Sequence, residues 1–259
     1  MSIGLVVLFW AVLGAAVGSF LNVAADRLPE GGSLFSPPSH CGACGRRLAA
    51  AEMVPVWSYL ALRGRCRTCG AAIGVRTLGV ELITGLLFVL AAARISALSL
   101  AEWGTLLFTS ASLAVLVVVT VTDLEHGLIL NRVILPAIGL GLIGALLVGW
   151  PSLLARLGGG LLGAGVIVLI IVLVPRGMGW GDVRLAGFVG LTTGLRGILF
   201  ALFVAFVSGG LVAGALLTAG IRRRGDTIPL GPFLAVGGGA ALLYGDEMLR
   251  AFYALTTLF

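Results

Sequence analysis

The sequence predicts an all-α polytopic membrane protein with about eight transmembrane helices and a small cysteine-bearing domain between the first two. Three observations support this prediction. Hydrophobic residues make up 59% of the 259 residues and charged residues only 11%, against about 25% charged in globular proteins. The apolar residues form continuous runs instead of alternating with polar ones, which favours helices over a β-barrel. One polar stretch, 24–77, interrupts the runs and holds all four cysteines.

Eight apolar runs predict the membrane spans, because a helix needs about 20 consecutive apolar residues to cross the hydrocarbon core of a bilayer. The runs are 3–23, 78–97, 104–122, 129–149, 158–175, 183–195, 197–219 and 229–249. The first has no basic segment before it and no small-residue cleavage site after it, so we interpret it as a retained span and not a signal peptide. The sixth is short for a full crossing, which fits a tilted helix, a half-inserted helix or a thinned bilayer. Fusing it with the seventh would give seven spans and move the C-terminus to the other side.

The distribution of arginine predicts the orientation of these spans. All 17 basic residues are Arg, and with the N-terminus outside, 13 of them face the cytoplasm. The four that then face out are Arg94, Arg156, Arg196 and Arg250. Because the cytoplasmic loops of membrane proteins have an excess of basic residues, we expect an external N-terminus and a cytoplasmic 24–77 segment. The same bias explains the net charge of +6, so we expect no nucleic-acid partner.

The polar segment 24–77 is too short to build a large core, and domains of this size usually need a staple. It contains two Cys-x-x-Cys pairs separated by 21 residues, which are Cys41, Cys44, Cys66 and Cys69. Two such pairs predict a closed tetrahedral zinc site whose role is folding and not catalysis. His40 is an alternative ligand, and two disulfides or four free thiols are alternative states. A reducing cytoplasm disfavours the disulfides.

Two aspartates lie at the edges of predicted spans. Asp123 closes the third span, and Asp182 opens the sixth in the sequence Gly179-Trp-Gly181-Asp182. Ionisable groups at a membrane edge are costly and by default suggest function. The eight-span topology places both at the cytoplasmic boundary, where they can meet at one depth. Two carboxylates that share a site cannot both ionise easily, so one keeps a proton while the other can accept one from water, as in aspartic proteases.

The helix dipole suggests different roles for the two acids, and other functions stay open. Asp182 begins a helix, where the positive end favours a carboxylate, whereas Asp123 ends one. We therefore predict that Asp182 is the ionised member and that Asp123 holds the shared proton. Alternatively, each aspartate is an ordinary interfacial residue or helix cap. The pair would also suit a proton-coupled transporter, and a zinc-stapled scaffold would need neither acid.

Several further motifs accompany the cysteines and the aspartates. They are Gly18-Ser-Phe-Leu-Asn22, Arg27-Leu-Pro29, Pro55-Val-Trp-Ser-Tyr59, Glu81-Leu-Ile-Thr-Gly85, Gly181-Asp182-Val-Arg184 and Ile228-Pro-Leu-Gly-Pro-Phe233. With these motifs the chain resembles the bacterial type IV prepilin peptidases, of the Gly-x-Gly-Asp aspartic protease group. The resemblance implies a bacterial inner-membrane enzyme, with Asp123 and Asp182 as the catalytic pair at the cytoplasmic face. It also implies that the enzyme removes the leader of pilin-like precursors and then, as many members do, methylates the new N-terminus with S-adenosylmethionine. The alternative is a peptidase without methyltransferase activity.

The resemblance implies three parts and leaves the methyl-donor site without residues. The parts are a first transmembrane helix over 1–23, a cytoplasmic zinc-binding domain over 24–77 and a transmembrane aspartic peptidase domain over 78–259. The implied partners are prepilin-like precursor proteins and membrane lipid. No strand is followed by a Gly-x-Gly-x-x-Gly turn, so a Rossmann-type cofactor site is not supported. The glycines of 158–165 lie in an apolar run and are interpreted as helix packing.

The chain departs from the family pattern at two positions. Arg184 stands where the family usually has Lys; it keeps the charge, but a guanidinium does not readily give up its proton. We expect Arg184 to support the site electrostatically, together with Gly181, which brings the backbone close to the acid. The segment Ile129-Leu-Asn131 replaces a familiar Ile-Pro, so we expect the local loop geometry to differ there without moving the aspartates.

The predicted orientation can be tested with a reporter fused after Arg76, the last arginine of the polar segment. Because 13 of the 17 Arg residues face the cytoplasm in this topology, the reporter should be active as a cytoplasmic fusion. An external signal from this fusion would invert the topology and weaken the argument for zinc.

Overall fold

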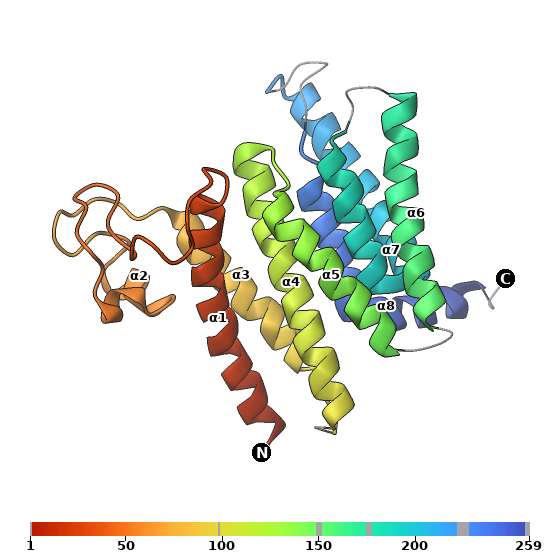
Figure 1. The fold of residues 1–259 in the computed structure, drawn as a ribbon, viewed down its shortest axis with the longest axis horizontal. Helices are drawn as coiled ribbons and strands as arrows, with labels where there is room; N and C mark the ends of the chain where they lie inside the picture. The colour runs from red at the N-terminus through yellow and green to blue at the C-terminus, as the bar shows by residue number, and fades with distance from the viewer. Residues whose placement is uncertain (1, 98, 149–151, 175–177, 222–227, 257–259) are drawn as a thin grey trace. The chain divides into compact units, whose positions relative to one another are not determined.

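The computed structural model describes residues 2–97, 99–148, 152–174, 178–221 and 228–256, and most of these residues are helical (Figure 1). The long helices are α1 (Ile3–Arg27), α3 (Val75–Ala92), α4 (Leu100–His126), α5 (Asn131–Val148), α6 (Ser152–Leu173), α7 (Trp180–Thr218) and α8 (Gly231–Thr256). Two short elements, η1 (Ala50–Met53) and α2 (Trp57–Ala61), lie in the polar segment. Within the described ranges the extended pairing is limited to isolated bridges. The predicted all-α class is confirmed.

The described helices are those of a multi-pass membrane protein. Five of them, α1, α3, α4, α6 and α7, are long and apolar enough to cross a bilayer. Shorter apolar helical stretches occupy Asn131–Leu147 and Gly231–Gly245. Arg176 and Arg222–Arg224, four of the predicted cytoplasmic arginines, lie outside the described residues.

The chain forms two compact units, residues 1–118 and 119–259. In the first unit α1 and α3 run antiparallel at close range. A Cβ at Gly18 would lie 2.8 Å from the Cα of Glu81, and one at Gly14 would lie 2.7 Å from the Cβ of Phe88. Small residues allow helices to approach in this way without a hydrophobic driving force. The cysteine segment belongs to this unit and follows α1 directly.

In the second unit the chain reverses direction inside α7. Gly194 has φ 76° and ψ −177°, which are not helical angles. A Cβ at Gly163 of α6 would lie 2.5 Å from the carbonyl oxygen of Ala186 and 2.9 Å from Cγ1 of Ile198. In a straight helix those two residues would be about 18 Å apart along the axis. The helix is therefore a hairpin of two arms, 180–193 and 195–218, which correspond to the sixth and seventh predicted spans.

Glycines of α6 bring that helix against the first arm of α7. Gly190 lies so close to the backbone of Gly159 that no side chain fits between them, and a Cβ at Gly160 would lie 2.8 Å from Cγ of Leu191. The predicted packing role of this glycine cluster is confirmed for Gly159, Gly160 and Gly163, whereas a Cβ at Gly165 would meet nothing within 4 Å. At the end of the first arm, Nη1 of Arg156 donates to the carbonyl oxygen of Thr192 at 2.9 Å. This bond satisfies a carbonyl that the break in the helix leaves without its usual partner.

Candidate active site and metal centre

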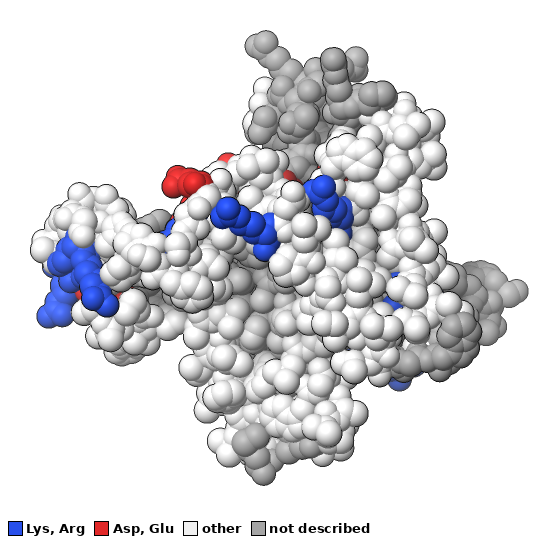
Figure 2. Space-filling model, viewed as in Figure 1, with Lys and Arg blue, Asp and Glu red and all other residues white. Residues whose placement is uncertain are grey.

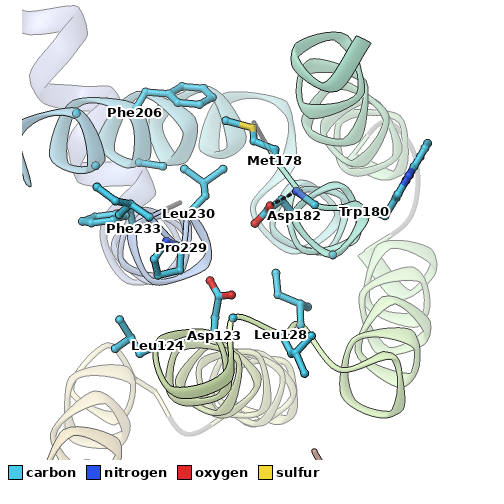
Figure 3. A pocket seen from close by; sticks show the side chains of 18 residues that line it. Asp123, Leu124, Leu128, Met178, Trp180, Asp182, Phe206, Pro229, Leu230 and Phe233 are labelled. Atoms are coloured by element: carbon cyan, nitrogen blue, oxygen red, sulfur yellow. Dashed lines mark hydrogen bonds between the residues drawn. The ribbon is translucent and has the colours of Figure 1, made fainter. Parts of the chain in front are cut away.

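Both predicted aspartates line one cavity of about 780 Å³ in the second unit (Figure 3). The end of α4, the start of the first arm of α7, the second arm of α7 and the start of α8 all contribute to its wall. The two carboxylates are the only ionisable side chains among its described lining residues. The other lining residues are glycines and apolar side chains, including Leu124, Leu128, Met178, Trp180, Phe206 and Phe233.

Asp123 lies in the last turn of α4 and is only 6% exposed. Its Oδ2 accepts the backbone N–H of Gly231 at 3.0 Å. Gly231 is the first residue of α8, so its N–H is one of the donors that a helix start leaves free. A Cβ at Gly231 would collide with the carboxylate of Asp123. Only glycine therefore permits this contact at position 231.

Asp182 lies in the first turn of α7 and is half-buried. Its Oδ2 accepts the backbone N–H of Gly179 at 2.9 Å, while its own N–H donates to the carbonyl oxygen of Gly179 at 3.1 Å. This reciprocal pair is the capping arrangement of a helix start. Figure 3 shows Asp182 on the side of the cavity opposite α8, with Asp123 below.

In the structure, the helix dipole does not distinguish the two acids, because each carboxylate lies at the start of a helix. The sequence places only the end of α4 next to Asp123. The carboxylate of Asp123 also faces the start of α8 through Gly231, so both acids accept an N–H at the beginning of a helix. Gly231 was not singled out as a site residue, although the motif Ile228–Phe233 contains it. Its role depends on a contact between residues 108 positions apart, which local sequence patterns do not reveal.

The two supporting residues hold the segment that follows α4. A Cβ at Gly181 would lie 2.8 Å from the Cβ of Ile129, so the absence of a side chain lets this segment approach α7. Nη1 of Arg184 donates to Oδ1 of Asn131, and Arg184 is not among the residues that line the cavity. Arg184 and Asn131, which both lie where the chain departs from the family pattern, are therefore joined by one hydrogen bond. Arg184 joins the start of α7 to the start of α5.

The four cysteines converge in the first unit. Their Sγ atoms all lie within 4.8 Å of one another, and those of Cys41 and Cys69 are 3.8 Å apart. A tetrahedral zinc with Zn–S bonds of about 2.3 Å requires sulfur–sulfur distances of about 3.8 Å. All four cysteines are free thiols, without a disulfide. Nδ1 of His40 lies 3.0 Å from the carbonyl oxygen of Pro38, outside the cluster. The cluster can hold a metal ion.

The two cysteine pairs have the same backbone geometry, repeated at an interval of 25 residues. In the first, Cys41 N–H donates to the carbonyl oxygen of Arg46 at 2.9 Å, and Cys66 N–H does the same to Ala71 at 2.8 Å. A glycine with φ 70° closes each turn at the equivalent position; these are Gly45 and Gly70. Each turn presents its sulfurs on one side, so two copies facing each other make a four-sulfur site.

Backbone hydrogen bonds favour the ionised form of one ligand at this site, Cys66. The backbone N–H groups of Cys69 and Thr68 lower the pKa of Cys66 to about 6. A thiolate, and not a thiol, is the form that binds metals. Beside it, Nη2 of Arg46 lies 2.6 Å from Oε1 of Glu52, and these hydrogen bonds lower the pKa of Glu52 to about 2. Arg46 and Glu52 join the first cysteine turn to η1.

Known proteins resemble this chain along nearly its whole length. Residues 12–95 match the bacterial peptidase A24 N-terminal domain, and residues 110–214 match the type IV leader peptidase family. A protein of Bacillus subtilis (strain 168) is 31% identical over 249 residues, which cover 93% of this chain and 95% of that protein. Another, of Pseudomonas putida, is 35% identical over 264 residues, with 92% of this chain and 90% of that protein covered. Both are named prepilin leader peptidase/N-methyltransferase. No solved structure matches the chain.

We expect the purified protein to contain about one zinc ion per chain, the stoichiometry of a structural Cys₄ site. Replacing Cys66 with Ser should remove most of the metal and destabilise the 24–77 segment, because a closed site contributes folding energy. The control Thr68→Ser, between two cysteines, should keep its zinc. Elemental analysis measures both. A chain without bound metal, in which all four thiols react freely with an alkylating reagent, would contradict the expectation.

Proposed function

The chain belongs to the type IV leader peptidase family, and on that premise we propose that it is a membrane aspartic endopeptidase that removes the leader of prepilin-like precursors. The observation that supports this best is the cavity in which Asp123 and Asp182 are the only ionisable lining residues of the described chain. Each carboxylate is held by the N–H group of a helix start. A protease needs such a pair to be fixed before the substrate arrives.

The proposed reaction uses the two carboxylates as one unit that shares a proton. The ionised member takes a proton from a water molecule, whose oxygen forms a bond to the carbonyl carbon of the scissile peptide. The protonated member donates to the carbonyl oxygen. When the tetrahedral intermediate collapses, the C–N bond breaks and a proton passes to the leaving amine. A closely coupled pair titrates jointly, so the shared proton belongs to the pair and not to one carboxylate alone.

The apolar wall of the cavity supports this chemistry in two ways. Leu124, Phe206 and Phe233, among others, surround the two acids with apolar side chains, which lower the local dielectric constant. The same side chains offer contacts to apolar residues on either side of the cleaved bond. Gly181 and Arg184 support the pair indirectly, because they hold the 127–131 segment against the start of α7.

We further propose that the chain methylates the new N-terminus with S-adenosylmethionine. The names of the relatives support this activity. The residues 24–77 would form the zinc-binding domain, with Cys41, Cys44, Cys66 and Cys69 as ligands, between a first transmembrane helix over 1–23 and the peptidase domain over 78–259. Zinc in a closed four-sulfur site has no position open for a substrate, so it would stabilise this domain without taking part in methyl transfer.

We propose that the protein lies in the bacterial inner membrane with its active site at the cytoplasmic face. The end of α4 and the starts of α5, α7 and α8 meet around the cavity, so the site lies at one end of the second unit. Arg132 and Arg184 lie at that end, beside Asn131. The excess of arginine that the eight-span topology places in the cytoplasm supports this side.

Asp123→Asn and Asp182→Asn should each reduce cleavage of a prepilin peptide by roughly 10⁴-fold, the loss typical of removing one member of a catalytic unit. Asparagine keeps the shape of aspartate but cannot exchange the proton. Cleavage is measured in detergent with purified protein, and the thermal unfolding of each variant confirms the fold. Methyl transfer to a pre-cleaved peptide should survive both changes. Near-normal cleavage by either variant would exclude the pair, and proton-coupled flux in liposomes without any cleavage would favour a transporter.

Gly231→Ala should reduce cleavage by roughly 10²-fold, because a displacement of a catalytic group by about 1 Å can cost that much. The added Cβ would displace the carboxylate of Asp123 and lengthen its bond to the N–H of residue 231. The matched control is Gly210→Ala, since Gly210 also lines the cavity but a Cβ there meets nothing within 4 Å. The rates of the two variants are compared at equal zinc content and thermal stability. Equal rates would show that Gly231 does not position Asp123.

A further inference from the structure

The segment that joins the two cysteine pairs exposes its apolar side. Four large apolar side chains between η1 and the end of α2 are 45–69% exposed, although the chain around them is folded; they are Met53 (47%), Val54 (45%), Trp57 (69%) and Leu60 (60%). Trp57 and Leu60 are three residues apart in α2 and therefore share one face of that helix, while Met53 and Val54 precede it at the end of η1. We call these four side chains the 53–60 patch. A water-soluble domain would present polar side chains on this side.

The opposite side of the segment is used by contacts within the first unit. Oε2 of Glu81 in α3 accepts the backbone N–H of Val56 at 2.7 Å. The hydroxyl of Tyr59 donates to the carbonyl oxygen of Ile73 at 3.5 Å, and a Cβ at Gly64 would lie 2.9 Å from the Tyr59 ring. These contacts bind the segment both to α3 and to the second cysteine turn. The segment cannot turn its apolar side inward without breaking them.

The contact with Glu81 places the patch at the level of a membrane helix. Glu81 is 4% exposed and lies six residues after Val75, the first residue of α3, which is about 9 Å along the helix axis. α3 is apolar enough over its 18 residues to cross a bilayer. Figure 1 shows α2 beside the length of α1 and not beyond its end. Trp57 and its neighbours therefore lie at the depth of the first turns of a transmembrane helix, where the headgroups of a bilayer meet the upper part of its acyl chains.

Val56, which lies next to the patch, has a backbone conformation that is unfavourable for its residue type. Its φ is 62°, a left-handed conformation that is costly for a β-branched residue. The hydrogen bond from its N–H to the buried carboxylate of Glu81 holds the backbone in this state. The strained residue lies directly before α2 and sets the direction in which Trp57 and Leu60 point.

Basic residues follow the patch along the chain. Arg63, Arg65 and Arg67 are exposed, and segment 24–77 contains seven Arg against three acids, Asp26, Glu30 and Glu52. Figure 2 shows basic side chains gathered on the surface of this segment. Exposed Trp and Leu next to Arg is the composition that favours the interface of an anionic bilayer, where the rings enter the headgroup region and the arginines contact phosphates.

We propose that the 53–60 patch is a membrane-docking surface that inserts into the headgroup and upper acyl region of an anionic bilayer. The lipid would be the partner of the exposed side chains, and the bond between Glu81 and Val56 would hold the patch at the depth where lipid meets it. The cysteine domain would then lie against the membrane surface and not extend into the aqueous phase. This proposal does not depend on the peptidase or methyltransferase activity.

The test places the photoreactive amino acid p-benzoylphenylalanine at position 57 or position 60 of the full chain. The protein is reconstituted without substrate in vesicles of phosphatidylethanolamine containing a minority of phosphatidylglycerol. The control is the same probe at position 47, where Arg47 is an exposed residue of the same domain outside the patch. After illumination, mass spectrometry should find several-fold more phospholipid adduct at positions 57 and 60 than at position 47. All three proteins must retain zinc.

Equal lipid adduct at the three positions would overturn the proposal. Crosslinks from positions 57 and 60 to a second copy of the chain, in place of lipid, would also overturn it and would identify the patch as a protein interface. A second measurement uses natural side chains. Phospholipids brominated in the upper acyl chain should quench the fluorescence that is lost in Trp57→Phe. The absence of a quenched component at Trp57 would contradict docking even if the probe variants fold poorly.

Discussion

A helix inside a bilayer leaves polar groups at its ends that lipid cannot satisfy, and the second unit of this protein is organised around that constraint. The N–H groups at the starts of α7 and α8 meet the carboxylates of Asp182 and Asp123. The carbonyl that the break in α7 frees is bonded by Arg156. The two carboxylates thus accept hydrogen bonds from N–H groups at helix starts. These hydrogen bonds lower the cost of burying the acids in a membrane protein and also fix their positions. In the proposed function, the hydrogen bonds that satisfy the helix starts would also position the two acids for catalysis.

Glycine makes these short distances possible. Gly231 permits the carboxylate of Asp123 to reach a backbone N–H, and Gly181 permits the segment after α4 to approach α7. At the other end of the first arm, Gly190 lets α6 and α7 meet almost backbone to backbone. The left-handed φ of Gly194 then allows the chain to turn back, so that Phe206 reaches the same cavity as Asp182. An added methyl group would lie within 3 Å of the Asp123 carboxylate at Gly231, of the Ile129 side chain at Gly181 and of the Gly159 backbone at Gly190, so each of these close approaches depends on glycine.

In the first unit, the polar segment 24–77 has little core of its own and is held together by other contacts. The two cysteine turns hold their sulfurs at the distances that a tetrahedral metal requires. The ion pair between Arg46 and Glu52 joins the first turn to η1, and Tyr59 joins α2 to the second. One buried acid, Glu81, then ties the segment to α3. The large apolar side chains of the 53–60 patch remain exposed. This exposure would be stable if a bilayer surrounded them.

The sequence by itself determined the all-helical membrane class, the convergence of the four cysteines and the helix edges at which Asp123 and Asp182 lie, because apolar run length, Cys-x-x-Cys spacing and a charge at a span edge are local properties. It also indicated the break between the sixth and seventh spans, which the structure shows as the turn at Gly194. Only the tertiary structure decided which backbone groups hold the acids, since the contact between Asp123 and Gly231 crosses 108 positions. It likewise decided that Arg184 bonds Asn131 instead of facing the cavity, and that Trp57 points outward. Those outcomes depend on the distances between helices, which packing sets and which no local pattern in the chain encodes.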